Sequence, residues 1–224
     1  MSSTREKKLL FLFAGVFSVI TLLLVWQFYF QATSFFQAGS RPAVADQQEA
    51  KPIMPPIRES DPARGGSGED AVTIVEYADF TCVYCRAVES EIVSVLNKNP
   101  EVRHIWRDMP VASDTPKAMI ASVAGRCAQD QGKFWDMHYL LLGAEQITLD
   151  RVSEFAKQIK LNQTTFTSCM SSNKHVLELQ EDISIARDHG ITSAPTLFIG
   201  NEVISGFATA SEIRWAVLRA KWSN

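Results

Sequence analysis

The chain has 224 residues, a formal net charge of -3 and four cysteines. This length suits one folded domain with an appendage. The charge shows none of the basic excess that phosphate binding requires, so we expect no nucleic-acid partner. The even number of cysteines permits two disulfide bonds, or one disulfide bond and a reactive pair.

Residues 9–30 form an apolar run without a charged side chain. A helix of this length, at about 1.5 Å per residue, crosses a bilayer core of about 30 Å, so we predict a transmembrane anchor. The basic residues within 1–8 predict a cytoplasmic N-terminus, which places the remaining chain outside the inner (cytoplasmic) membrane, in the periplasm. The alternative is a cleaved signal peptide, because residues 43–45 resemble a cleavage site, although the apolar run is longer than usual for one.

Residues 31–70 are rich in Pro, Gly, Ser and Gln. Such a composition buries too little apolar surface to offset the entropy lost on ordering the chain. We therefore predict a flexible linker over 31–70 that tethers a folded domain over 71–224.

The folded domain opens with a strand, a helix and a second strand. Residues 72–77 and 102–106 are apolar and β-branched, as in buried strands, and residues 86–96 have the apolar spacing of a helix. A strand-helix-strand unit predicts parallel pairing of the two strands with a right-handed crossover.

Cys82 and Cys85 form a Cys-x-x-Cys between the first strand and the helix. A thiol at the start of a helix meets unpaired backbone N–H groups and the positive end of the helix dipole, which favour the thiolate. Cys82 is therefore the expected nucleophile, and Cys85 the thiol that closes a disulfide with it. A zinc site needs four ligands, and no second close pair of Cys or His follows, so we expect no metal.

A long helical region follows, and the chain then returns to strands. Either Asp114 or Thr115 is expected to cap the first helix of this region. The other elements are helices over 149–159, 164–170 and 176–188, strands over 196–199 and 203–205, and a last helix over 211–221 that Ser211 caps. Strands early and late in the domain, with helices between them, predict an α/β fold.

Cys127 and Cys169 remain once the Cys-x-x-Cys is paired. Both fall in predicted helices, and outside the cytoplasm they can be oxidised, so we expect a structural disulfide between two helices. Two buried, reduced thiols are the alternative.

Three segments, together with the helical region between the early and late strands, resemble the thioredoxin superfamily and its DsbA-like branch of secreted thiol-disulfide oxidoreductases. The segments are residues 73–85, residues 132–138 and residues 190–200. The resemblance covers about residues 71–221 and implies a thioredoxin fold with a helical insertion at about 114–189. Within the second segment, Phe134 and Trp135 are expected to pack in a helix, and His138 is expected to be a hydrogen-bonded structural residue.

The resemblance also implies that Pro195 follows a cis peptide bond and faces the active-site sulfurs. A cis-proline removes an N–H and exposes the backbone of Ala194, which would bind an extended client peptide. Val83 and Tyr84, between the cysteines, complete the expected substrate-binding residues. An ordinary trans proline in a turn is the alternative.

Glu76, six residues before Cys82, matches the superfamily position of a buried acid beneath the disulfide. Burial raises the pKa of a carboxyl group, which can then accept the proton that Cys85 must lose. A glutamate that reaches solvent at a sheet edge is the alternative.

These features predict a membrane-anchored dithiol oxidase that introduces disulfides into reduced client proteins. A membrane partner of the DsbB type would reoxidise it, and no bound cofactor is expected. A disulfide reductase or isomerase with a transmembrane electron donor is the nearest alternative. A non-catalytic peptide-binding chaperone is the alternative from another class.

Overall fold

The protein is described by a computed structural model over residues 20–29, 53–68, 71–110 and 115–222. The chain divides into two units, Met1–Glu49 and Ala50–Asn224. In the first unit, residues 20–29 are helical. The rest of the predicted anchor 9–30, the basic N-terminus and the possible cleavage site lie outside the described residues. A search of the described helices finds none with the length and hydropathy that a bilayer crossing requires.

The second unit is built on a five-stranded sheet with the order β1-β3-β2-β4-β5. β2 and β3 are parallel, as predicted, and the other neighbours are antiparallel. The strands are β1 (Ala63–Gly65), β2 (Val72–Ala78), β3 (Val102–Asp108), β4 (Thr196–Ile199) and β5 (Glu202–Ser205).

Helices cover both faces of this sheet. On one face, α2 (Val83–Lys98) and α8 (Ala210–Trp222) pack against each other, and the core there contains Ile74 and Ile92. On the other face, α7 (Lys174–Asp188) packs through Ile183. Side chains alternate between the two faces along β2. Glu76 therefore lies on the face that Ile74 shares with α2.

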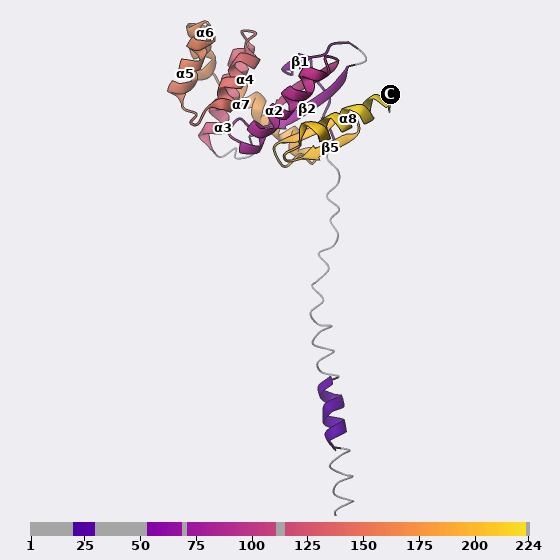
Figure 1. Cartoon of the computed structure of the whole chain (residues 1–224). Helices are drawn as coiled ribbons and strands as arrows, with labels where there is room; N and C mark the ends of the chain where they lie inside the picture. The colour runs from indigo at the N-terminus through magenta and orange to yellow at the C-terminus, as the bar shows by residue number, and fades with distance from the viewer. Residues whose placement is uncertain (1–19, 30–52, 69–70, 111–114, 223–224) are drawn as a thin grey trace, which may run out of the picture. The chain divides into compact units, whose positions relative to one another are not determined.

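The predicted helical insertion is present between β3 and β4, and several of its helices form a group beside the sheet (Figure 1). A disulfide joins Cys127 to Cys169, as predicted, and thereby links the first and fourth helices of the insertion. Besides α7, the helices are α3 (Pro116–Gln129), α4 (Phe134–Gly143), α5 (Leu149–Gln158) and α6 (Gln163–Ser171).

The prediction of a flexible linker up to residue 70 is wrong for residues 53–68. β1 adds an edge strand to the sheet and pairs antiparallel with β3. Gly65 suits this strand end because its φ is +86°, and because a Cβ there would lie 2.4 Å from the Val102 carbonyl oxygen. The glycines that suggested a linker therefore let the chain pass close to β3, and the folded domain begins before residue 71.

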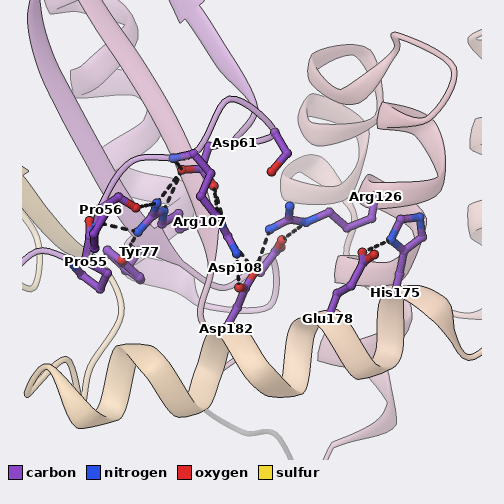
Figure 2. A network of polar contacts seen from close by, with 12 residues as sticks. Pro55, Pro56, Asp61, Tyr77, Arg107, Asp108, Arg126, His175, Glu178 and Asp182 are labelled. Atoms are coloured by element: carbon purple, nitrogen blue, oxygen red, sulfur yellow. Dashed lines mark hydrogen bonds and ion pairs between the residues drawn. The ribbon is translucent and has the colours of Figure 1, made fainter.

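Buried ionic contacts also hold the segment before β1 to the sheet (Figure 2). Arg107 on β3 donates hydrogen bonds to Asp61, at 3.1 Å from Nε to Oδ2, and to the Tyr77 hydroxyl at 2.6 Å. It also donates to the Pro55 carbonyl at 3.3 Å. The Asp61 carboxylate is buried, and these contacts supply the partner that a buried charge needs. A neighbouring pair, Arg126 and Asp108, links α3 to β3 at 2.7 Å.

The last helix begins one residue earlier than predicted, and Thr209 rather than Ser211 caps it. The Thr209 hydroxyl accepts from the Glu212 N–H at 3.3 Å, and the Glu212 carboxylate accepts from the Thr209 N–H at 2.8 Å. This reciprocal pair is a capping box, which satisfies two N–H groups at the helix start. At the start of α3, Thr115 occupies the N-cap position and Pro116 is the first helical residue, while Asp114 lies outside the described residues.

Candidate active site

Cys82 occupies the N-cap position of α2, at the boundary between the loop after β2 and the helix. Its Sγ accepts a hydrogen bond from the Cys85 N–H at 3.2 Å, and both cysteines are reduced in this structure. The pKa of Cys82 is lowered to about 6. The hydrogen bond from the Cys85 thiol contributes most, the N–H groups of Cys85 and Tyr84 add to it, and partial burial opposes them. Cys82 therefore has the thiolate character and the access of a nucleophile.

Cys85 has the opposite environment, because its side chain is fully buried in the first turn of α2. The hydrogen bond to Cys82 raises the pKa of the Cys85 thiol far above its ordinary range, and burial and the charges of Cys82 and Glu76 raise it further. The Asp79 N–H donates to its Sγ at 3.5 Å. Cys85 thus stays protonated while Cys82 is ionised, so a base must remove its proton before it can attack.

The peptide bond between Ala194 and Pro195 is cis, as the resemblance implied. It lies immediately before β4, and the Cys82 thiol donates to the Ala194 carbonyl at 3.5 Å. The loop that carries Ala194 is therefore in contact with the nucleophilic sulfur. The Gly206 N–H donates to the Pro195 carbonyl at 2.8 Å, which holds the loop after β5 against the cis-proline.

Val83 and Tyr84 follow Cys82 at the surface and are 68% and 61% exposed. Phe207, which follows Gly206, is also exposed, and the sequence analysis did not single it out. No local sequence pattern marks Phe207. Its position near the cis-proline loop depends on the hydrogen bond between the preceding Gly206 and Pro195. Apolar side chains beside an accessible sulfur provide contact area for a peptide.

Glu76 lies in β2, an inner strand of the sheet, and its side chain is fully buried. This position excludes the alternative of a glutamate that reaches solvent at a sheet edge. Its Oε2 lies 2.9 Å from Nε2 of His104 on β3. Burial raises the pKa of Glu76 well above its ordinary value, and the charge of Glu89 adds to this effect. The carboxyl group is therefore suited to accept a proton at neutral pH.

The sequence analysis missed the polar cluster that surrounds Glu76. Arg64 on β1 donates to Glu89 on α2, at 2.8 Å from Nη2 to Oε1, and its guanidinium lies 4.1 Å from the centre of the Trp135 ring. Arg64 also donates to Nδ1 of His104. A basic residue in a Gly-rich segment gives no sequence signal for such a cluster, because β1 is only three residues long.

His138 on α4 differs from its expected role as a hydrogen-bonded structural residue. Its side chain is fully buried, and neither ring nitrogen has a hydrogen-bond partner within the described residues. Its ring packs against Trp106 at 4.6 Å and against Trp135 at 4.8 Å between ring centres. Burial lowers the pKa of His138 well below its ordinary value, so the ring is neutral.

Trp135 and Phe134 pack as expected, and the Trp135 indole donates to the Ala63 carbonyl at 3.0 Å.

Two groups of side chains within the described residues have the composition of a metal site. The first contains Glu76, Glu89 and His104, whose ligand atoms lie within 4.8 Å of one another. Arg64 already places a positive charge there and donates hydrogen bonds to Glu89 and His104. Its guanidinium therefore competes with a metal cation for these two side chains. The second contains His175 and two cysteines, but those cysteines form the disulfide between α3 and α6.

Comparisons with known proteins identify the family of this chain. A family model described as Thioredoxin matches residues 60–218. The Na(+)/H(+) antiporter NhaA 1 of Salinispora arenicola is 30% identical over 172 residues, which are 75% of this chain and 26% of the antiporter. Disulfide bond formation protein D of Bacillus subtilis is 21% identical over 160 residues, which are 66% of this chain and 72% of that protein. The chain therefore spans about a quarter of the length of the first of these relatives.

Solved structures share the fold. A thioredoxin-like oxidoreductase from Silicibacter pomeroyi aligns with a TM-score of 0.67 and 24% identity, over 75% of this chain and 95% of that one. BdbD from Bacillus subtilis aligns with a TM-score of 0.64 and 20% identity, over 77% of this chain and 96% of that one. At these identities the likeness establishes the fold, while the chemistry rests on the residues of the site.

Proposed function

We propose that this chain, which belongs to the thioredoxin family, is a thiol-disulfide oxidoreductase and acts as a dithiol oxidase. The observation that carries the proposal is the asymmetry of the two cysteines. Cys82 is accessible with a lowered pKa, while Cys85 is buried with a raised pKa. Such an asymmetry lets one sulfur exchange with a client while its neighbour waits to close the disulfide.

In the oxidase reaction, a client thiolate attacks Sγ of Cys82 in the oxidised protein. The Cys82–Cys85 bond breaks, Cys85 leaves as a thiolate and takes up a proton, and a mixed disulfide forms. A second client thiolate then attacks the client sulfur of the mixed disulfide, and Cys82 leaves as a thiolate. The client gains a disulfide and loses two electrons, which the Cys82–Cys85 pair receives. A membrane partner of the DsbB type would remove these electrons, and no bound cofactor is needed.

Client binding in this proposal uses the backbone of Ala194 beside Pro195. The Ala194 carbonyl oxygen lies 3.5 Å from Sγ of Cys82, so an extended peptide that pairs with this segment brings its own thiol to the sulfur. Val83 and Tyr84 supply exposed apolar contact area next to the attacked atom. These contacts are largely main-chain and apolar, which suits unfolded clients of varied sequence.

The direction of the reaction follows from which redox state the protein stabilises. A stabilised Cys82 thiolate favours the reduced protein and makes the disulfide a stronger oxidant. Equilibration of the full chain with glutathione buffers measures this potential. We expect a value clearly above that of thioredoxin, which is about -270 mV. A potential at or below that value would instead favour the reductase or isomerase alternative.

The location of the domain is part of the same proposal. We infer that residues 9–30 anchor the chain in the inner membrane and that the domain faces the periplasm, because the run lacks charge and follows basic residues. Extraction of membranes with alkaline carbonate tests this anchoring. Release of the full chain into the supernatant would contradict it.

The non-catalytic chaperone alternative has its own test. A chaperone that binds peptides beside Pro195 does not require a reactive thiol. If Cys82 of the reduced protein failed to react with an alkylating reagent at neutral pH, a chaperone function would replace the proposed enzymatic function.

A further inference from the structure

β1 places Arg64 directly opposite His104 on β3. Both Nε and Nη2 of Arg64 lie within hydrogen-bond distance of Nδ1 of His104, at 3.1 Å and 3.0 Å. An arginine side chain only donates hydrogen bonds and remains charged in proteins. Nδ1 of His104 must therefore be an unprotonated acceptor.

This contact fixes the protonation of the whole ring. A neutral imidazole that accepts at Nδ1 carries its proton on Nε2. Nε2 lies 2.9 Å from Oε2 of Glu76, so His104 donates to that oxygen. Burial, and then the charge of Arg64, lower the pKa of His104 well below its ordinary value, which agrees with a neutral ring.

The two carboxylate oxygens of Glu76 therefore have different surroundings. Oε2 accepts the hydrogen bond from His104, whereas Oε1 is buried and has no hydrogen-bond partner among the residues that the structure describes. A buried acceptor without a partner is rare and calls for an explanation. Oε1 is the oxygen that remains available to take a proton.

We propose that Arg64 and His104 are positioning residues that hold Glu76 so that Oε1 exchanges a proton with the Cys85 thiol. This inference rests on the proposed function and concerns the step in which Cys85 attacks a mixed disulfide at Cys82. The proton of Cys85 passes to Oε1, the Cys85 thiolate forms a bond to Sγ of Cys82, and the client sulfur leaves as a thiolate. In the oxidase direction the same proton returns to Cys85 as it leaves.

The charges around Glu76 set the sign of the expected pH effect. The titratable groups around Glu76 come from β1, β3, α2 and α4. Arg64, Glu89 and the Cys82 thiolate are charged, whereas His104, His138 and Cys85 are neutral. Glu89 and a Cys82 thiolate raise the pKa of Glu76, while Arg64 lowers it. The bond from His104 stabilises the carboxylate, and its loss therefore raises the pKa of Glu76 further. A variant without that bond should need a higher pH to release the proton of Cys85.

The test separates the two thiol steps with an aromatic disulfide that releases one coloured thiolate in each step. Reduced full chain attacks it through Cys82 in the first phase, and Cys85 resolves the mixed disulfide in the second. The His104→Leu variant removes both hydrogen bonds. The His104→Gln variant keeps an N–H for Glu76 and a carbonyl for Arg64. Arg103→Leu, on the same strand with its side chain on the opposite face, is the matched control.

We expect His104→Leu to slow the second phase by about 10- to 100-fold, part of the roughly 10²- to 10⁴-fold that a positioned proton acceptor contributes. Its pH profile should shift to higher pH, while His104→Gln and Arg103→Leu retain the original profile. In a Glu76→Gln background, His104→Leu should have little further effect. An unchanged second phase, or an equal slowing without Glu76, would overturn the inference.

The first phase separates this inference from the proposed function. A rapid first phase in every variant shows that Cys82 is an active nucleophile, so the second phase alone then decides the roles of Arg64 and His104. Loss of the first phase in the unmodified chain would contradict the proposed function itself. Should His104→Leu fail to fold, Arg64→Lys is used instead. It keeps the charge but replaces the forked guanidinium, so we expect the same shift of the second phase to higher pH.

Discussion

Cys82 and Cys85 are separated by two residues, yet the fold gives them opposite acidities. The cap position exposes the first sulfur to N–H donors, and the helix turn buries the second sulfur against β2. The difference in acidity therefore comes from the hydrogen bond between the two thiols, from the N–H groups of Cys85 and Tyr84, and from the burial of Cys85.

The lowered pKa of Cys82 makes the stability of the reduced protein depend on pH. A depressed pKa stabilises the folded state fully above the ordinary pKa of a cysteine, and this contribution is lost as pH falls through about 6. We expect the free energy of unfolding of the reduced protein, relative to that of Cys82→Ala, to decrease from pH 9 to pH 6. Urea denaturation at several pH values measures it. A difference that does not vary with pH would contradict the prediction.

Among the elements that do not carry the cysteines, β1 and the helical insertion support the polar cluster around Glu76. β1 brings Arg64 to the sheet, and the residues before it are held by the buried pair of Asp61 and Arg107. The insertion packs α4, with His138 and Trp135, over the polar cluster around Glu76. Both elements can therefore be tested through stability as well as through thiol exchange.

The disulfide between α3 and α6 should stabilise the insertion without affecting the active site. It joins residues separated by 42 positions, and the loop-entropy estimate for such a loop is about 4 kcal/mol. We expect the Cys127→Ala, Cys169→Ala double variant to lose up to that amount in free energy of unfolding. The alkylation rate of Cys82 is the control and should not change. A double variant as stable as the unmodified protein would show that the disulfide is no brace.

The ion pair of Asp61 with Arg107 predicts a loss of stability of similar size from a single substitution. Burial alone would raise the pKa of Asp61, but hydrogen bonds from Arg107 and the Arg58 N–H outweigh it and keep the pKa below its ordinary value. Asp61→Asn leaves Arg107 buried without its counter-charge, which costs about 3 to 5 kcal/mol. Urea denaturation measures this loss.

An exposed pair provides the control for Asp61. Glu154 pairs with Arg151 at the surface of α5, so Glu154→Gln should leave the free energy of unfolding unchanged within error. Equal effects of the two substitutions would mean that burial does not determine the strength of the Asp61 pair.

At the scale of the whole molecule, the sequence predicted those parts that depend on local patterns. The parallel pair β2–β3, the helices of the insertion and the position of Cys82 at a helix start all follow from short segments. The cis bond before Pro195 came from the family resemblance. β1 was missed because three residues among glycines carry no periodic signal, and its pairing with β3 is non-local.

The polar cluster was missed for the same reason. His104 lies within an apolar strand and Arg64 within a presumed linker, and only the register of β1 on β3 brings them together. The cap of α8 was a different kind of error, because Thr209 and Glu212 have the spacing of a capping box and could have been found from the sequence.

The central claim is that the fold stabilises the Cys82 thiolate, and a pH titration of thiolate absorbance in the reduced full chain tests it most directly. Cys82→Ala identifies which transition belongs to this residue. We predict a first transition near pH 6 that is absent from the variant. A transition of Cys82 at about pH 8.5, where a free cysteine titrates, would contradict the account.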